Sequence, residues 1–392
     1  MTSAGSLGAK SLGRLRNLDD VRDGARRRLP RMIFDFVDGG AEDELTMRRN
    51  RLAFDDIVFH PHVLVDVAKR DISTELFGRR LELPVIFGPA GLQGLIHRRG
   101  ELAAASAAGD AGTVYVLSFG SSYSIEEVAK AATGPLWLQL SPWKDRSLSE
   151  QMLSRCAASG YEAVCLTVDV AVGALRERDL RNGMTLPFRV TPRNAVDTAL
   201  HPTWLPTAYA SLRRHLGNFD TASGAHRSGA VGVAKWVSAT MNPSATWDEL
   251  AWLRSVWSGK LLIKGVQRAD DARRARDAGV DGVIVSNHGG RQLDGVPAAI
   301  DSLPAVAEAV GAELPVILDG GVRRGSHVVK AIALGATAVS IGRPYVLSLA
   351  FGDAGPRRVL DILRSEIDTT LALLGSRSFS DLDNSMITRR NR

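Results

Sequence analysis

A histidine and an arginine follow a short apolar segment in DGVIVSNHGGRQLDG, at residues 281–295. His288 can exchange a proton near neutral pH, and Arg291 can bind a carboxylate through two parallel hydrogen bonds. A second pair stands earlier in the chain, where Asp169 ends the apolar segment AVCLTVD and Arg176 follows it. Asp169 is the natural carboxylate to fix the tautomer of His288 and to stabilise its cation. These four residues predict acid–base chemistry on a substrate that carries a carboxylate.

Three further segments add positive charge and glycine turns. Lys264 ends the apolar segment KLLIKGV, where its charge can stabilise a developing anion. LDGGVRRG and SIGRP place Gly321, Arg323, Gly342 and Arg343 at predicted helix starts, where backbone N–H groups and guanidinium groups suit a phosphate. The alternative is that these glycines only form tight turns. Neither a G-x-x-x-x-G-K-[ST] loop nor the Rossmann glycine spacing is present, so we predict another phosphate-bearing cofactor.

Eight short apolar segments rich in β-branched residues predict the strands that position these side chains. They cover residues 83–89, 114–120, 136–141, 163–169, 260–266, 282–289, 315–321 and 338–344. Most of the intervening segments have helix-like patterns, and this alternation is typical of a parallel sheet covered on both faces. Eight such units favour a closed (β/α)₈ TIM barrel over an open doubly wound sheet. The polar residues at the carboxyl ends of the strands should therefore meet in one cavity.

The bulk composition limits the classes of partner. The chain has 392 residues, and Lys plus Arg exceed Asp plus Glu by six, but the basic residues are scattered without interleaved aromatic residues. This pattern does not indicate nucleic-acid binding. Cys156 and Cys165 form neither a disulfide framework nor a set of metal ligands, so we expect a reducing, cytoplasmic location and no metal. No apolar segment is long enough to span a bilayer.

One domain is expected over residues 16–380, with a disordered tail at 1–15 and a second tail at 381–392. We predict amino-terminal helices interrupted at Pro30 and a hairpin in DISTELFGRRLELP that covers the barrel floor. A long insertion follows the fourth strand, at about residues 187–243. Within it, residues 203–219 predict an amphipathic basic helix with an apolar face of Leu205, Ala208, Leu212, Leu216 and Phe219. This helix either lies on a membrane or packs on the barrel as part of a lid.

The motifs SNHGGRQLD, LTVD, LLIKG, LDGGVRRG and IGRP resemble those of the FMN-dependent 2-hydroxy-acid oxidase and dehydrogenase family. The resemblance extends from about residue 28 to residue 379, and RERDLRNG and LHPTW are similar to its mandelate dehydrogenase branch. It implies oxidation of an (S)-2-hydroxy acid, aromatic or bulky, to the 2-oxo acid. It also implies that electrons pass to oxygen or quinone and that the enzyme is a homotetramer. The comparable insertion of mandelate dehydrogenase binds the membrane, so peripheral contact of residues 203–219 with the inner face of the membrane stays open beside packing on the barrel. Hydride and proton transfer of the α-hydrogen both stay open.

The resemblance also implies a role for each site residue. His288 is the base, Asp169 its partner, Arg176 and Arg291 the carboxylate binders, and Lys264 the cation at flavin N1. The residues implied to hold the rest of FMN are Pro89, Ala90 and Gly91 at the N5 edge, Ser118, Gln139, Thr167 and Ser286 along the ring and ribityl chain, Asp319 on the ribityl group, and Gly321, Arg323, Gly342 and Arg343 at the phosphate.

Two substrate-site positions depart from the family pattern. Phe36 and Ser141 stand where the family usually has tyrosines, and Trp143 or Tyr123 either lines the space so left or packs elsewhere. These changes favour a reshaped substrate site, and they leave open an FMN-dependent tailoring oxidase that acts on a noncarboxylate, an amine or a peptide-derived compound. A noncatalytic flavin- or phosphate-binding protein is the remaining alternative, and the presence of His288 argues against it.

Overall fold

The computed structural model describes residues 12–184, 191–207, 216–219 and 239–390. Its centre is a closed barrel of eight parallel strands, in which each strand pairs with the next in sequence and the last with the first. The barrel strands are β4 (Val85–Phe87), β5 (Tyr115–Ser118), β6 (Leu136–Leu140), β7 (Ala163–Thr167), β8 (Lys260–Val266), β9 (Gly282–Ser286), β10 (Val316–Asp319) and β11 (Ala338–Ile341). Each lies within one of the predicted segments, so the predicted TIM barrel is confirmed.

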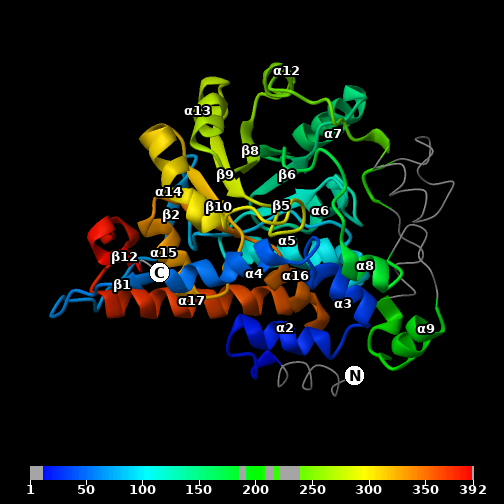
Figure 1. Ribbon diagram of the computed structural model, residues 1–392, viewed down its shortest axis with the longest axis horizontal. Helices are drawn as coiled ribbons and strands as arrows, with labels where there is room; N and C mark the ends of the chain where they lie inside the picture. The colour runs from blue at the N-terminus through cyan, green and yellow to red at the C-terminus, as the bar shows by residue number, and fades with distance from the viewer. Residues whose placement is uncertain (1–11, 185–190, 208–215, 220–238, 391–392) are drawn as a thin grey trace.

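Helices cover the outside of the barrel (Figure 1). They are α5 (Gly100–Asp110), α6 (Ile125–Ala131), α7 (Arg146–Ala158), α12 (Asp248–Val256), α13 (Ala269–Asp277), α14 (Ala299–Val310), α15 (Gly325–Ala333), α16 (Arg343–Ser348) and α17 (Gly355–Leu374). Local sequence sets several of their ends. Ser124 and Glu127 form a capping box at the start of α6, and α17 ends at Gly375, whose φ of 74° suits glycine.

The barrel interior has an apolar lower layer. Side chains alternate along a strand, so every second residue points inward. One inward residue from each strand belongs to a single buried apolar cluster: Ile86, Val116, Trp137, Cys165, Leu262, Ile284, Ile317 and Ala338. This layer is a packed core, and it leaves only the upper end of the barrel for polar side chains.

An antiparallel hairpin closes the lower end of the barrel, as predicted. It consists of β2 (Thr74–Leu76) and β3 (Arg79–Leu81). Leu76 and Leu81 are buried in the same cluster as the inward residues, and the Phe77 ring centroid lies 5.7 Å from that of Trp137.

Helices before the barrel lie beside the site end. Pro30 separates α2 (Leu18–Arg26) from α3 (Arg31–Asp38), which confirms the predicted interruption, and α4 (Leu45–Leu52) follows. Helix α3 contacts α8 (Glu177–Arg181), α9 (Pro192–Ala199) and α16, and Figure 1 shows α8 next to the end of α3. Segments separated by about 140 residues therefore meet at this edge of the barrel.

The structure corrects the inner boundaries of both predicted tails. Leu15 is buried in the core, and β12 (Ile387–Arg389) pairs with β1 (Ile57–Phe59) as an antiparallel ladder. Backbone pairing beyond residue 380 ties this end of the chain to the domain.

Only part of the predicted helix at 203–219 is described, since Ala208 and Leu212 lie outside the described residues. Leu216 and Phe219 are buried in the main core, whereas Leu205 is exposed. These two buried residues pack on the barrel. No helix among the described residues is long and apolar enough to cross a membrane.

Candidate active site at the carboxyl ends of the barrel strands

A polar layer lies directly above the apolar layer of the barrel. Moving two residues along each strand from the apolar set keeps the same inward direction. The residues reached in this way are Gly88, Ser118, Gln139, Thr167, Lys264, Ser286, Asp319 and Ser340. Six of the predicted flavin-binding residues, Ser118, Gln139, Thr167, Lys264, Ser286 and Asp319, therefore occupy one level of the barrel, although they come from six different strands.

Lys264, Ser286, Asp319 and Ser340 form a buried network in this layer. Lys264 Nζ lies 2.9 Å from Asp319 Oδ2 and donates to Ser286 Oγ at 2.8 Å. Ser286 Oγ donates to Asp319 Oδ2 at 2.7 Å, and Ser340 Oγ donates to Asp319 Oδ1 at 2.9 Å. The strand register places Asp319 between its two serine neighbours, because it pairs with Ser286 on one side and Ser340 on the other.

The charges of this network stabilise each other. Burial alone raises the pKa of Asp319, but the Lys264 ammonium and the hydrogen bonds to the carboxylate lower it below its usual value. Burial opposes the charge of Lys264, yet Asp319 and Asp169 raise its pKa above the usual value. The network therefore keeps a cation at the centre of the polar layer at neutral pH.

His288 and Asp169 come together above this network. His288 Nδ1 lies 3.0 Å from Asp169 Oδ1, so the other ring nitrogen can face a substrate. Burial raises the pKa of Asp169, and the charges of His288 and Lys264 more than offset that effect, so the pKa is lowered overall. Gly265 makes room for this carboxylate, because a Cβ on Gly265 would lie 2.7 Å from Asp169 Cβ.

The turn that carries His288 has an uncommon backbone conformation. His288, Gly289 and Gly290 have φ angles of 55°, 65° and 71°. Left-handed backbone is unfavourable for histidine and acceptable for glycine. The His288 backbone N–H donates to Ser286 Oγ at 3.0 Å, which ties the turn to the buried network. Such local strain is characteristic of functional sites.

Arg176 and Arg291 both lie against the ring of Phe36. Both guanidinium carbons are 5.7 Å from the ring centroid of Phe36. Arg291 Nη1 donates to the backbone carbonyl of Gly39 at 2.8 Å, and no carboxylate in the described part of the chain lies within 4.0 Å of it. Burial and the charges of Arg176 and Arg343 lower the pKa of Arg291, so an anionic ligand beside it would be stabilised.

Arg323 and Arg343 form a second cationic region. Arg343 donates to the backbone carbonyls of Gly289 and Gly39 at 2.7 and 2.8 Å. Burial and the charge of Arg343 lower the pKa of Arg323 to about 10. Neither arginine has an ion-pair partner among the residues that the structure describes. Two neighbouring guanidinium groups without a carboxylate are the electrostatic pattern of an anion site.

Gly321 and Gly342 differ in the space that they leave for a side chain. Gly321 has φ 80°, and a Cβ there would lie 2.0 Å from the Asn50 carbonyl oxygen, so the tight turn itself requires glycine. A Cβ on Gly342 would meet nothing within 4 Å. Packing thus explains Gly321, while Gly342 leaves open space next to Arg343.

Ser118 and Gln139 pair on the other side of the polar layer. Ser118 Oγ donates to Gln139 Oε1 at 3.1 Å, and Gln139 Nε2 donates to Ser141 Oγ at 3.2 Å. The loop of Pro89, Ala90 and Gly91 follows β4 beside them. A Cβ on Gly91 would lie 2.7 Å from the Gly120 carbonyl oxygen, so a close approach of two backbones requires this glycine.

The two positions that depart from the family pattern have different surroundings. Phe36 contacts both carboxylate-binding candidates, whereas Ser141 is only 2% exposed and its hydroxyl is bonded to Gln139. Trp143 packs against Phe119 and Phe219, with ring centroids 4.9 and 6.0 Å away. Tyr123 donates to the Arg98 carbonyl at 2.5 Å. Both aromatic residues belong to the packed core.

The polar layer fits a phosphorylated flavin. Thr167 Oγ1 and Arg343 Nε are buried polar atoms without a hydrogen-bond partner in the described structure. Buried polar groups are normally paired, so these atoms indicate a polar ligand. Lys264, Arg323 and Arg343 supply positive charge for the anionic groups of FMN, and Gln139 and Ser118 supply hydrogen-bonding groups for its ring.

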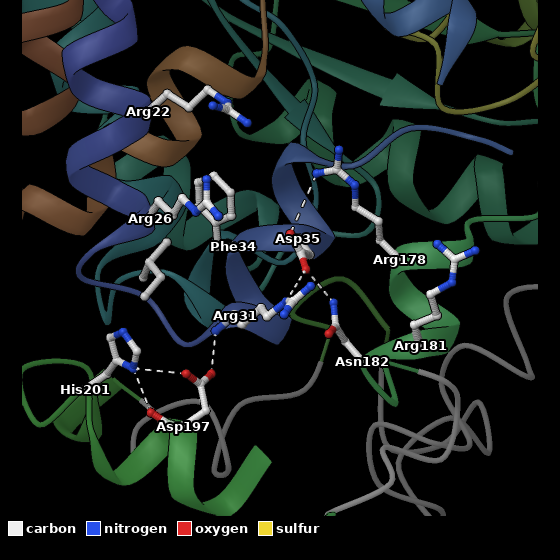
Figure 2. A pocket seen from close by; sticks show the side chains of 11 residues that line it. Arg22, Arg26, Arg31, Phe34, Asp35, Arg178, Arg181, Asn182, Asp197 and His201 are labelled. Carbon is white, nitrogen blue, oxygen red and sulfur yellow. Dashed lines mark hydrogen bonds and ion pairs between the residues drawn. The ribbon is translucent and has the colours of Figure 1, made fainter. Parts of the chain in front are cut away.

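A cavity of the described residues lies elsewhere. It has a volume of about 460 Å³, and none of the predicted site residues lines it. Figure 2 shows its wall, where Asp35 faces Asn182, Arg31 and Arg178. Asn182 Nδ2 donates to Asp35 Oδ2 at 2.7 Å, and Arg178 pairs with Asp38 at 3.1 Å. These bonds join α3 to α8 and thereby fix Phe36 relative to Arg176.

Sequence reasoning missed Ser340, Asp179 and the carbonyl of Gly39. Ser340 bonds Asp319, Asp179 pairs with Arg176, and Gly39 accepts from both Arg291 and Arg343. Ser340 precedes the IGRP motif by one residue, and its position two residues after Ala338 on an inward-facing register was the available signal. A backbone carbonyl has no sequence signal.

Comparison with known proteins agrees with this arrangement. A family model described as FMN-dependent dehydrogenase matches residues 25–389. An L-lactate dehydrogenase of Caulobacter vibrioides is 44% identical over 95% of this chain and 97% of its own length. Glycolate oxidase 5 of Oryza sativa is 40% identical over 97% and 98%, respectively. A crystal structure of (S)-mandelate dehydrogenase, described as a monotopic membrane protein, superposes with a TM-score of 0.91, at 40% identity and with 96% and 100% coverage. The chain belongs to the FMN-dependent dehydrogenase family.

Proposed function

We propose that this protein oxidises an (S)-2-hydroxy acid with an aromatic or otherwise bulky side chain to the 2-oxo acid. The main support is the position of the His288–Asp169 pair on the same rim as Arg176 and Arg291. A base and two carboxylate binders at one barrel end suit a substrate whose reacting carbon lies next to a carboxylate.

The two arginines bind the substrate carboxylate in this proposal. No carboxylate of the described residues lies within ion-pair distance of Arg291, and Arg176 lies against the same Phe36 ring. A carboxylate between two guanidinium groups would be held in one orientation by charge-assisted hydrogen bonds. That orientation fixes which face of the 2-carbon is presented to the cofactor, and so it selects one enantiomer.

His288 takes the proton in the reaction. Asp169 holds Nδ1, which leaves Nε2 to accept a proton from the substrate, and the carboxylate stabilises the resulting imidazolium. FMN, when bound, would supply the oxidant: it would take up the two electrons and the second hydrogen that the substrate loses. Lys264 lies in the polar layer as a fixed cation, where it stabilises the negative charge that reduction places on the ring.

FMN would be held by the residues that the sequence indicated for it. Asp319 and Ser286 would bind the ribityl chain, Ser118, Gln139 and Thr167 the ring, and Pro89, Ala90 and Gly91 would line its edge. Arg323, Arg343 and the glycines Gly321 and Gly342 would bind the phosphate. The support is that these residues, from separate strands, share one end of the barrel.

A bulky substrate follows from the substrate-site changes and from the structural similarity. Phe36 offers an apolar ring where a tyrosine hydroxyl is usual, and apolar contacts favour an aromatic substrate side chain. One of the similar solved structures is a mandelate dehydrogenase.

We further propose that electrons pass from the reduced cofactor to oxygen or quinone, that the protein is a cytoplasmic homotetramer, and that it contacts the inner face of the membrane peripherally. The support is that relatives include both a dehydrogenase and an oxidase, and that the similar mandelate dehydrogenase is described as monotopic.

The test is anaerobic mixing of the FMN-bound protein with (S)-mandelate, (S)-lactate and glycolate, followed through the oxidised-flavin absorbance. Fast bleaching by (S)-mandelate and loss of that bleaching in a flavin-replete His288→Ala variant would support the proposal. Bound flavin that no 2-hydroxy acid reduces would refute it and direct attention to noncarboxylate substrates.

A further inference from the structure

Asp179 pairs with one of the two carboxylate-binding candidates. Its Oδ2 lies 3.2 Å from Arg176 Nε, three residues earlier in the chain. The Asp179 side chain is 9% exposed, whereas that of Arg176 is 36% exposed. Arg176 is the residue immediately before α8, and Asp179 lies in the first turn of that helix. The carboxylate is therefore fixed by the helix, and the guanidinium is the mobile partner.

The position of Asp179 determines which edge of the Arg176 guanidinium remains for a ligand. A guanidinium can bind a carboxylate through Nε and one Nη, or through both Nη atoms. Asp179 comes closest to the guanidinium at Nε. The contact with Asp179 is an ion pair rather than a hydrogen bond, and the side chain of Arg176 makes no hydrogen bond within the part of the chain that the structure describes. The outer edge with both Nη atoms is the edge left for a ligand.

A second contact restrains the same group. The Arg176 guanidinium carbon lies 5.7 Å from the Phe36 ring centroid. The ring limits movement across its face, and Asp179 limits rotation about the end of the side chain. Arg291 differs, because backbone carbonyls of Val37 and Gly39 hold it.

We propose that Asp179 is a positioning residue that turns the outer edge of Arg176 toward the substrate carboxylate. This inference rests on the proposed function, since it assigns Arg176 to carboxylate binding. Asp179 therefore affects only ligands that carry a carboxylate, and it affects their binding rather than the rate of flavin reduction. An arginine without this carboxylate partner would sample several rotamers, and a ligand would have to order it.

The experiment measures ligand dissociation constants and limiting rates of flavin reduction in the FMN-bound protein. The variants are Asp179→Ala, which removes the partner, and Asp179→Asn, which keeps its shape but removes its charge. Glu177→Ala is the matched control, because Glu177 lies in the same helix turn and pairs instead with Arg181. The ligands are (S)-mandelate, its neutral methyl ester, and benzoate as a nonreacting carboxylate.

The expected result is a dissociation constant for (S)-mandelate and benzoate about fivefold to tenfold higher in Asp179→Ala, the size of one lost polar contact. The limiting rate with (S)-mandelate should change less than about twofold. The methyl ester should bind as in the unmodified protein, Asp179→Asn should lose about as much affinity as Asp179→Ala because the contact is an ion pair, and Glu177→Ala should have no effect.

Two results would overturn the inference: unchanged carboxylate affinity in Asp179→Ala, or an equal loss for acid and ester, which would indicate a general distortion of α8. Benzoate separates this outcome from failure of the proposed function. Its binding reports on Arg176 through the flavin spectrum, whether or not any hydroxy acid reduces the flavin.

Discussion

His288 Nδ1 lies 3.0 Å from Asp169 Oδ1, although 119 residues separate the two in the chain. The carboxylate is mostly buried, and Lys264 and His288 keep its pKa below the usual value. It is therefore ionised at neutral pH and can hold the imidazole in one tautomer, with Nε2 free to act as a base.

The Asp169→Asn variant tests this relationship. An asparagine amide can donate to the ring or accept from it but cannot stabilise an imidazolium by charge. We expect the limiting rate of anaerobic flavin reduction to fall by roughly 10²- to 10⁴-fold. The FMN content, measured from the absorbance of the purified protein, should stay unchanged. A rate within about threefold of the unmodified protein would contradict the role assigned to Asp169.

Replacing Lys264 with methionine should weaken the centre of the barrel. It leaves Asp319 as a buried carboxylate without its cation. Breaking a buried ion pair on one side typically costs about 3–5 kcal/mol. We expect a free energy of unfolding lower by about that amount, measured by urea denaturation, and loss of FMN during gel filtration. Lys260→Met is a control on the same strand, because its partner Asp281 keeps a second cation, Arg254.

Asp319 should make stability depend on pH in the acid range. Its pKa in the folded protein is lower than the ordinary value of 3.8. A group with a depressed folded pKa contributes stability above its unfolded pKa, and that contribution disappears as the pH falls through the folded pKa. The difference in free energy of unfolding between the unmodified protein and Asp319→Asn should be constant above about pH 5 and should shrink below about pH 4. Urea titrations of both proteins across this range provide the measurement, and a pH-independent difference would contradict the assignment.

Arg323 and its neighbour Arg324 offer a matched pair for the phosphate site. Arg323 has no ion-pair partner among the described residues, whereas Arg324 is paired with Glu366 at the surface. Arg323→Gln should weaken FMN binding by roughly 10- to 100-fold, the range for one charge-assisted hydrogen bond. Riboflavin, which lacks the phosphate, should bind equally to both proteins. Quenching of flavin fluorescence measures both affinities, and Arg324→Gln should leave both unchanged.

Restoring the family's tyrosine should have opposite effects at Phe36 and Ser141. Phe36 lies 5.7 Å from both guanidinium carbons, so Phe36→Tyr adds a hydroxyl near the bound carboxylate. We expect it to tighten hydroxy-acid binding by up to about tenfold. Stopped-flow measurement of flavin reduction gives the dissociation constant of the hydroxy acid. Weaker binding in Phe36→Tyr would indicate that the substrate needs the apolar phenyl ring at this position.

Ser141 has no room for the same change. It is 2% exposed and bonded to Gln139, so a tyrosine ring there must displace packed neighbours. Ser141→Tyr should lower the free energy of unfolding by about 1–3 kcal/mol, the usual cost of overpacking. Ser141→Ala, which removes only the hydroxyl, is the control. A stable Ser141→Tyr protein with improved turnover would show that this position opens onto the substrate.

The sequence alone determined the barrel and most of its polar layer. Each strand is a continuous apolar segment, because both faces of a barrel strand are buried, and the apolar residue and the polar residue two positions later share one direction. This is why Lys264, Ser286 and Asp319 could be assigned to one rim before any distance was known. The predicted domain boundary at residue 380 is wrong. Strand β12 lies beyond it and pairs with β1, and sequence patterns do not show pairing between opposite ends of the chain.

The tertiary structure alone decided which charges are compensated. The pattern RERD contains Arg176, Arg178 and Asp179. It does not say that Asp179 faces Arg176 while Arg178 pairs with Asp38 at the end of α3 and with Glu44 just before α4. It likewise does not say that Ser141 is buried while Phe36 contacts two arginines. Local periodicity sets the direction of a side chain, whereas its partner depends on how distant elements pack, and that packing is a property of the whole chain.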